Sequence, residues 1–228
     1  MHEPTKDALF GLCEDHLTRY EPDSTLLHPD VITPLEQLKQ EARQAGFDVR
    51  LASGHRSFAR QKALWNAKAL GQKPVLDERG QPLDTLALTE RDRVYAILRW
   101  SALPGGSRHH WGTDMDVFDA AALGPGQNLA LTREETQGAG LMAPFHRWLN
   151  GWLASADNPG FCRPYDRDRG GVAPEPWHLS YWPRAAGFAS LMSLPALTQL
   201  LAGQHDLALG AVVLDELPSI YQRFVQLP

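Results

Sequence analysis

The sequence has little of what a disulfide scaffold, a nucleic-acid binder or a membrane protein needs. Its only two cysteines, Cys13 and Cys162, lie far apart and show no C-x-x-C spacing. We expect two free thiols, with a single disulfide as the alternative. The 228 residues carry a net charge of −5, and no basic stripe predicts nucleic-acid binding. No stretch approaches the roughly 20 apolar residues of a membrane span.

A secretory signal is also missing from the first part of the sequence. Residues 1–30 contain several acids and no continuous apolar run. We therefore expect a cytoplasmic protein, or a periplasmic one if a leader has been removed. The length fits one domain with a sizeable core, and the sequence does not indicate an oligomeric state.

Helical and strand patterns are mixed along the chain, which predicts an α+β fold with a small antiparallel sheet and flanking helices. Residues 33–46 have the pattern of a helix, with Thr33 as its cap and Pro34 in its first turn. Ser57 and Thr89 are placed to cap two further helices. Strands are expected over 47–53 and 112–119 and in "FCRPY" and "WHLSY", the last two joined by a hairpin turn in "DRDRGG".

The last forty or so residues differ from the rest in forming short apolar helices. We predict a domain over residues 1–183, with its core at about 30–183, and a C-terminal helical appendage over 184–228 packed on it. Near the end, an amphipathic pattern places four apolar residues on one side of a helix: Leu217, Ile220, Tyr221 and Phe224.

Three short stretches concentrate polar residues that a structural role does not easily explain: "SGHRSFARQ" (53–61), "SRHHWGTDMD" (107–116) and "PEPWH" (174–178). A catalytic zinc takes three ligands from His, Asp or Glu and keeps one position open. His109 and Asp116 lie on either side of a turn at Gly112, and His178 can supply a third ligand. Prolines on both sides of Glu175 favour polyproline II, whose period of three would aim Glu175 and His178 the same way.

The three stretches resemble the zinc D-alanyl-D-alanine carboxypeptidases of the VanY and VanX type, which include the L,D-carboxypeptidases of peptidoglycan. That family has S-G-x-R-S, then S-x-H-x-x-G-x-A-x-D, then E-P-W-H. This sequence has "SGHRS" at 53–57, "SRHHWGTDMD" at 107–116 and "EPWH" at 175–178. The order and rough spacing agree over about residues 30–183. The resemblance implies the fold shared by Hedgehog proteins and D-Ala-D-Ala carboxypeptidases.

The resemblance also implies roles for individual residues. The zinc ligands would be His109, Asp116 and His178, with Glu175 as the catalytic base and Arg56 facing the scissile carbonyl. Arg56 and Arg108 are both candidates to hold the terminal carboxylate of the substrate, and the sequence does not choose between them. Further candidates for binding the peptide are Ser53, Gln61, Ser107 and Trp177.

Three residues near the motifs leave alternatives open. The family usually has a small apolar residue where this chain has Asp114, which either orients a ligand histidine or is simply hydrated. His110 is outside the ligand position, and it either lines the site or lies on the solvated surface. Asp119 is expected to cap the end of its strand.

The expected function is removal of a terminal D-alanine from peptidoglycan stem peptides. In the cytoplasm, a D,D-carboxypeptidase would destroy the pentapeptide precursors of the wall, so we favour L,D cleavage of tetrapeptides during recycling. The alternatives are D,D cleavage of pentapeptides or D-Ala-D-Ala, a peptidoglycan endopeptidase, and a zinc-binding module without catalysis. The only partner expected is a peptide derived from peptidoglycan.

Overall fold

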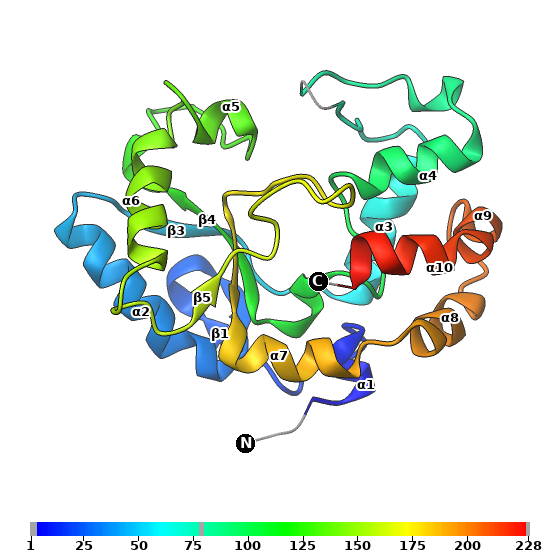
Figure 1. Ribbon diagram of the computed structural model, residues 1–228, viewed down its shortest axis with the longest axis horizontal. Coiled ribbons are helices and arrows are strands. Elements are labelled where there is room, and N and C mark those ends of the chain that lie inside the picture. The colour runs from blue at the N-terminus through cyan, green and yellow to red at the C-terminus, as the bar shows by residue number, and fades with distance from the viewer. Residues whose placement is uncertain (1–3, 78–79, 227–228) are drawn as a thin grey trace.

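The computed structural model, which describes residues 4–77 and 80–226, combines two antiparallel sheets with helices (Figure 1). A hairpin of β1 (Thr18–Tyr20) and β2 (Thr25–Leu27) comes first. The main sheet has the order β3-β4-β6-β5, formed by β3 (Val49–Ser53), β4 (Asp114–Asp119), β5 (Phe161–Cys162) and β6 (His178–Tyr181). The predicted α+β class is confirmed. The strands β5 and β6 pair as predicted, but residues 163–177 join them by a long loop and not by a tight turn.

Helices surround the main sheet and form the C-terminal part of the chain. They are α1 (Lys6–Leu9), α2 (Pro29–Gln44), α3 (Phe58–Ala69), α4 (Glu90–Leu98), α5 (Arg133–Thr136), α6 (Ala143–Leu153), α7 (Trp182–Leu191), α8 (Leu194–Ala202), α9 (Gly210–Asp215) and α10 (Leu217–Ile220). The predicted caps of α3 and α4 are confirmed, because Ser57 accepts a hydrogen bond from the backbone of Arg60 and Thr89 accepts one from Asp92. The chain continues from α10 into a π-helical turn, Tyr221–Val225.

The predicted start of α2 is wrong. The helix begins at Pro29 and is capped by His28, whose Nδ1 accepts a hydrogen bond from the backbone N–H of Asp30. Pro34 therefore lies inside the helix, where it removes one backbone hydrogen bond. Extending the helix buries Val31 on the same face as Leu35, and this packing favours the longer helix.

One face of the main sheet packs on α2 and α6. In the strands, Met115, Val117 and Leu179 point into this core and are fully buried. Helix α6 contributes Phe145 and Trp152 to the same core. Because side chains alternate along a strand, the residues between these apolar ones face the other side of the sheet. That opposite face carries the polar residues of the motifs.

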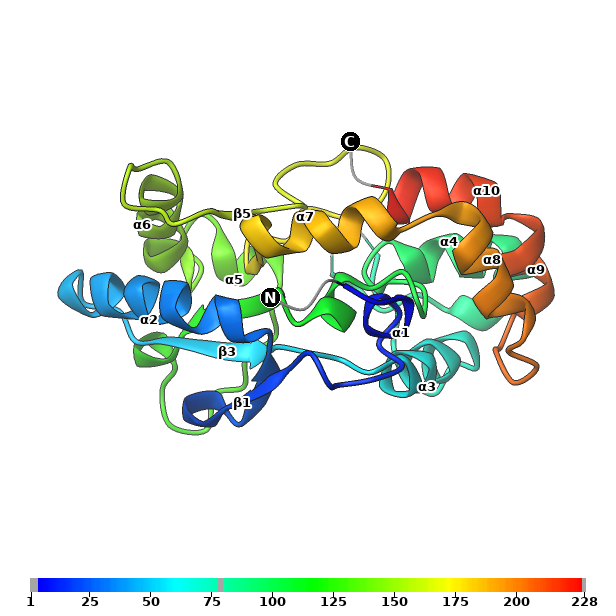
Figure 2. The same ribbon diagram turned by 90° about the horizontal axis from the view of Figure 1, so that it is seen from below.

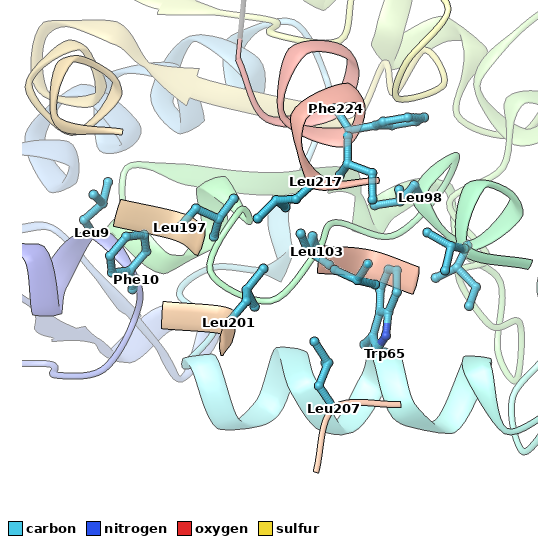
Figure 3. Close-up of a cluster of buried hydrophobic side chains, with 14 of the residues drawn as sticks. Leu9, Phe10, Trp65, Leu98, Leu103, Leu197, Leu201, Leu207, Leu217 and Phe224 are labelled. Atoms are coloured by element: carbon cyan, nitrogen blue, oxygen red, sulfur yellow. The ribbon is translucent and has the colours of Figure 1, made fainter. Parts of the chain in front are cut away.

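The C-terminal helices complete a second core. Helices α8, α9 and α10 lie beside α3 and α4, at the opposite end of the molecule from α2 and α6 (Figures 1 and 2). The side chains that gather there come from both ends of the chain and from its middle (Figure 3), among them Leu9, Phe10, Trp65, Leu98, Leu103, Leu197, Leu201, Leu217 and Phe224. The predicted apolar side of the last helix is buried, although Tyr221 is only half-buried. The domain boundary at residue 183 stays a prediction.

Both cysteines are free, as expected. Within residues 4–77 and 80–226, no single helix has the length and apolar character needed to cross a membrane. The pair α7 and α8 meets that criterion only jointly, across a bend of 71°.

Candidate metal centre

The pairing of three strands brings two of the candidate ligands together. In the ladder between β4 and β6, Asp116 lies directly opposite His178, and in the ladder between β3 and β4 it lies opposite Ser53. Side chains of directly opposed residues share a face of the sheet, with Cβ atoms about 4.5–5.5 Å apart. The alternation of "DMD" therefore sends Met115 into the core while Asp114 and Asp116 face the site.

The third candidate ligand, His109, lies on a short 3₁₀ helix, Arg108–Trp111, directly before β4. Gly112 reverses the chain between them with φ of +68°, a conformation that favours glycine, and a Cβ there would lie 3.0 Å from the backbone nitrogen of His28. Trp111 fixes the 3₁₀ helix. Its Nε1 donates to the carbonyl of Leu9 at 3.1 Å, and its ring stacks on Phe188 with 5.7 Å between centroids.

The three side chains form a cluster with the geometry of a metal site. One ligand atom from each of His109, Asp116 and His178 lies within 4.8 Å of the others. His109 Nδ1 bonds the carbonyl of Gly54 at 2.8 Å, which turns its Nε2 toward Asp116 at 3.4 Å. His178 presents Nδ1 to Asp116 at 3.3 Å. Asp116 Oδ1 is buried and has no hydrogen-bond partner among the described residues. Two imidazole nitrogens and a carboxylate are a donor set that suits catalytic zinc.

The charges of the site favour a bound cation. Burial by itself lowers the pKa of His178, but its contacts with Asp114, Asp116 and Glu175 raise that pKa well above its ordinary value. Burial raises the pKa of Asp116, but His109 and His178 outweigh it and hold the pKa well below its usual range. Among the described residues, Asp116 and Glu175 form ion pairs only with histidines, so a divalent metal would supply the compensating positive charge.

Asp114 is fully buried and belongs to a hydrogen-bonded network behind His178. It accepts hydrogen bonds from Arg108 at 2.7 Å, Thr113 at 2.8 Å and Ser180 at 3.1 Å, and it lies 3.1 Å from His178 Nε2. Burial opposes ionisation, but Arg108 and the bonds from His178 and Thr113 lower the pKa of Asp114 to about 2. The hydrated alternative is therefore wrong. Asp114 fixes which nitrogen of His178 faces the metal site.

Arg56 is held at the edge of the site by two of the residues predicted to bind the peptide. Its guanidinium donates to Gln61 Oε1 at 2.8 Å and to Ser53 Oγ at 3.1 Å. Gln61 is fully buried, and its amide also donates to the carbonyl of Ala102 at 2.6 Å. Both ends of the amide are thus used inside the protein. The structure places Gln61 behind Arg56 and not in the pocket where the sequence prediction put it.

Glu175 lies next to the triad, with Oε2 3.5 Å from His178 Nδ1. The two residues face the same way as predicted, but for a different reason. The backbone N–H of His178 bonds the carbonyl of Glu175 at 3.1 Å, which closes a turn through Pro176 and Trp177. Polyproline II has no such internal hydrogen bond. The turn, and not a polyproline II period, brings the carboxylate over the site.

A pocket with a volume of about 330 Å³ opens over the triad. Its lining includes the predicted site residues Arg56, Ser107, Arg108, His109, Asp116, Glu175, Trp177 and His178. A second pocket, with Ser53 in its lining, shares Arg56, Asp116 and Leu131 with the first. The metal cluster therefore lies where the two pockets meet, so that a peptide could occupy both sides of it.

His110 is not on the solvated surface, because it is fully buried. Its Nδ1 bonds the carbonyl of Arg56 at 2.6 Å, and its Nε2 accepts from the backbone of Gly105 at 3.1 Å. Burial lowers the pKa of His110 to about 3. The neutral ring joins two loops at the back of the site.

Two pocket residues were not found in the sequence. Tyr165 packs edge-on against His178 with 5.0 Å between ring centroids, and burial raises its pKa to about 12. Interpreting "FCRPY" as a strand hid it, because β5 ends at Cys162. Lys68 lines the pocket from α3. Lys68 follows Gln61 by seven residues, which is two helical turns, so the two side chains share one face of α3. That spacing is the sequence signal that could have identified Lys68 as a site residue.

Comparisons with known proteins identify the family. The sequence profile of the VanY family, D-alanyl-D-alanine carboxypeptidase, matches residues 24–184. The chain therefore belongs to this family of carboxypeptidases, as the motifs predicted.

Relatives of known sequence and structure extend the comparison. An uncharacterised protein of Haemophilus influenzae (strain ATCC 51907 / DSM 11121 / KW20 / Rd) is 34% identical over 102 residues, which cover 43% of this chain and 70% of that protein. A second from the same strain is 30% identical over 125 residues, covering 54% and 92%.

Two solved structures have the same fold. The vancomycin-resistance D,D-pentapeptidase VanY, as a variant in complex with Zn(II), has a TM-score of 0.50 and 22% identity, and the match covers 75% of this chain and 80% of that one. VanYB in complex with D-alanine-D-alanine has a TM-score of 0.52 and 19% identity, covering 82% and 88%. The predicted carboxypeptidase-like fold is confirmed.

Proposed function

We propose that the protein is a zinc-dependent carboxypeptidase that removes a terminal D-alanine from peptidoglycan stem peptides. The observation that supports this most directly is the buried triad, with its unbonded Asp116 oxygen, beside Glu175 in a chain of the D-alanyl-D-alanine carboxypeptidase family. His109, Asp116 and His178 would hold the zinc. When bound, zinc acidifies a water molecule and polarises the peptide carbonyl.

The residues around the triad supply proton transfer and charge stabilisation. Glu175 accepts a proton from the attacking water at Oε2 and then delivers it to the nitrogen of the leaving amino acid. Arg56 directs its guanidinium toward the oxygen that becomes negative as the carbonyl is attacked. Its bonds to Gln61 and Ser53 keep the guanidinium in place before the substrate arrives.

The metal assignment predicts that His109→Ala loses its zinc. The remaining pair, Asp116 and His178, gives only two protein ligands, which is fewer than a catalytic zinc site uses. Elemental analysis of the purified variant should find close to no zinc, against one per chain in the parent. His205→Ala, at an exposed histidine, is the matched control and should keep its metal. Full zinc occupancy in the His109 variant would refute the ligand set.

Within this reaction we propose L,D cleavage of tetrapeptides, as a recycling step in the cytoplasm. The supporting argument is metabolic. A D,D-carboxypeptidase in that compartment would destroy the pentapeptides that wall synthesis needs, whereas a tripeptide product can be reused. The D,D specificity is the alternative, and the motifs are common to both. Cell fractionation tests the compartment separately.

Kinetics on matched soluble peptides test this preference. We expect faster release of D-alanine from the tetrapeptide than from the pentapeptide, and the reverse order would establish the D,D specificity instead. Mass spectrometry of the products also separates the remaining alternatives. An endopeptidase would cut an internal bond of cross-linked stems, and a zinc-binding module without catalysis would release nothing.

A further inference from the structure

Lys68 is a cation in the pocket that the proposed mechanism does not use. It lies near the C-terminal end of α3, is half-buried, and lines the same pocket as Arg56, Glu175 and the triad. Among the described residues, no hydrogen bond or ion pair involves its ammonium group. An ammonium that lines a pocket and forms no ion pair there can pair with an anionic group of a bound ligand.

The other charged side chains of the pocket are paired, face the metal site or lie at the exposed rim. Arg108 is paired with Asp114 at 2.7 Å, while Asp116 and Glu175 face the metal site. Arg56 bonds only the neutral groups of Gln61 and Ser53. Arg133 and Glu134 at the rim are exposed and of opposite sign. Within residues 4–77 and 80–226, neither Arg56 nor Lys68, which both line the pocket, forms an ion pair with a carboxylate.

The ammonium of Lys68 remains available as a charged donor near neutral pH. Burial lowers its pKa to about 8, and Arg56 acts in the same direction while Glu175 opposes both. These influences also show that the ammonium lies within electrostatic reach of the residues at the metal site. A ligand that fills this pocket would contact both Lys68 and the triad, because both line it.

The two pockets give the direction in which a peptide would lie. They meet at Arg56, Asp116 and Leu131, and Lys68 lines only the first. The lining of the first pocket also includes the apolar residues Pro74 and Leu76 and the indole of Trp100. A small apolar residue that ends in a negative charge matches this part of the site. The body of the peptide then lies in the second pocket, on the far side of the metal cluster.

We propose that Lys68 binds a carboxylate of the substrate, namely the C-terminal carboxylate of the residue that is released. This inference rests on the proposed carboxypeptidase function. An ammonium and a carboxylate form a charge-assisted hydrogen bond, which is stronger than a neutral one. The terminal carboxylate is the anion that every substrate of a carboxypeptidase carries, and a side-chain carboxylate upstream of the cleaved bond is the other source of the same group. Lys68 is then a specificity residue that selects a free C-terminus.

The test compares Lys68→Met, which keeps the length of the side chain and removes its charge, with Lys68→Arg and the parent. Lys73→Met, at an exposed lysine nearby, is the matched control. Each protein is assayed on a peptide ending in D-alanine as the free acid and as the C-terminal amide, with and without an upstream side-chain carboxylate. For Lys68→Met we expect kcat/KM on the free acid to fall roughly 10- to 100-fold, mainly through KM, with little change on the amide. Lys68→Arg should restore part of the loss, and the control should match the parent.

Three outcomes would overturn the assignment. An equal loss on acid and amide would mean that Lys68 acts on the folded structure, and no loss on either would mean that it does not bind substrate. A loss that follows the upstream side chain would assign that carboxylate instead of the terminal one. Turnover of the free acid by the parent tests the proposed function by itself, so the two hypotheses fail on different measurements.

Discussion

Glu175→Ala should keep its zinc and lose turnover by roughly 10²- to 10⁴-fold, the usual contribution of a general base. The substitution removes the carboxylate beside His178 but leaves all three candidate ligands in place. His178 also keeps its contact with Asp114, so the orientation of the ring does not depend on Glu175. We therefore expect the loss in kcat, with zinc content unchanged by elemental analysis.

Glu134→Ala is the matched control for this experiment. Glu134 lines the same pocket but is exposed at its rim, so its removal should change kcat by no more than a few-fold. If Glu175→Ala were as active as that control, another group would have to be the base. Loss of zinc from Glu175→Ala would instead show that Glu175 is a ligand.

Truncation after Pro183 should abolish soluble, folded protein. Helices α7 to α10 and the turn that follows contribute a large share of the second core, including Phe188, Leu197, Leu201, Ile220 and Phe224. Each such side chain stabilises the fold by about 1.5–3 kcal/mol, while a whole domain is stable by only about 5–15 kcal/mol. A truncated protein with the melting temperature of the parent would mean that these helices form an independent element.

A single substitution tests the same packing without removing the helices. Leu217→Ala, at a residue that is 1% exposed, should cost about 2–5 kcal/mol of unfolding free energy. Leu214→Ala, three residues earlier and 36% exposed, should cost less than about 0.5 kcal/mol. Equal melting temperatures for the two variants would contradict the burial of Leu217.

The sequence predicted the four strands of the main sheet, although not their exact ends, because strands depend on local patterns; the hairpin of β1 and β2 was not predicted. The alternation of apolar and acidic residues at the start of "DMDVFD" indicates which side chains face the core. The acidic residues of that motif lie on the other face of the sheet. Once β4 and β6 pair, Asp116 and His178 must meet. The approach of these two residues follows from a period of two and an antiparallel register, whereas the position of His109 depends on a 3₁₀ helix held by Leu9 and Phe188.

What the sequence could not predict depends on contacts between distant segments. Pro34 was interpreted as the start of α2 because the sequence does not reveal that Val31 has a core to join. Arg108 and Asp114 form a closed ion pair only because a 3₁₀ turn and β6 enclose them. In the sequence, Lys68 looks like an ordinary helix lysine, because the residues that line its pocket come from distant segments. They include residues between 100 and 109 and residues from beyond position 130.

The 3₁₀ helix that carries His109 is attached to both ends of the chain, and this attachment affects when the metal cluster can form during synthesis of the protein. Trp111 is fixed by Leu9, near the start, and by Phe188, near the end. His178, whose ring lies edge-on to that of His109 with 4.8 Å between centroids, is also made late. A nascent chain that has reached only Asp119 has His109 and Asp116 but neither the stacking partner of Trp111 nor the third ligand. The complete group of three side chains therefore exists only after residue 178 has been made, which is late in the synthesis of this chain.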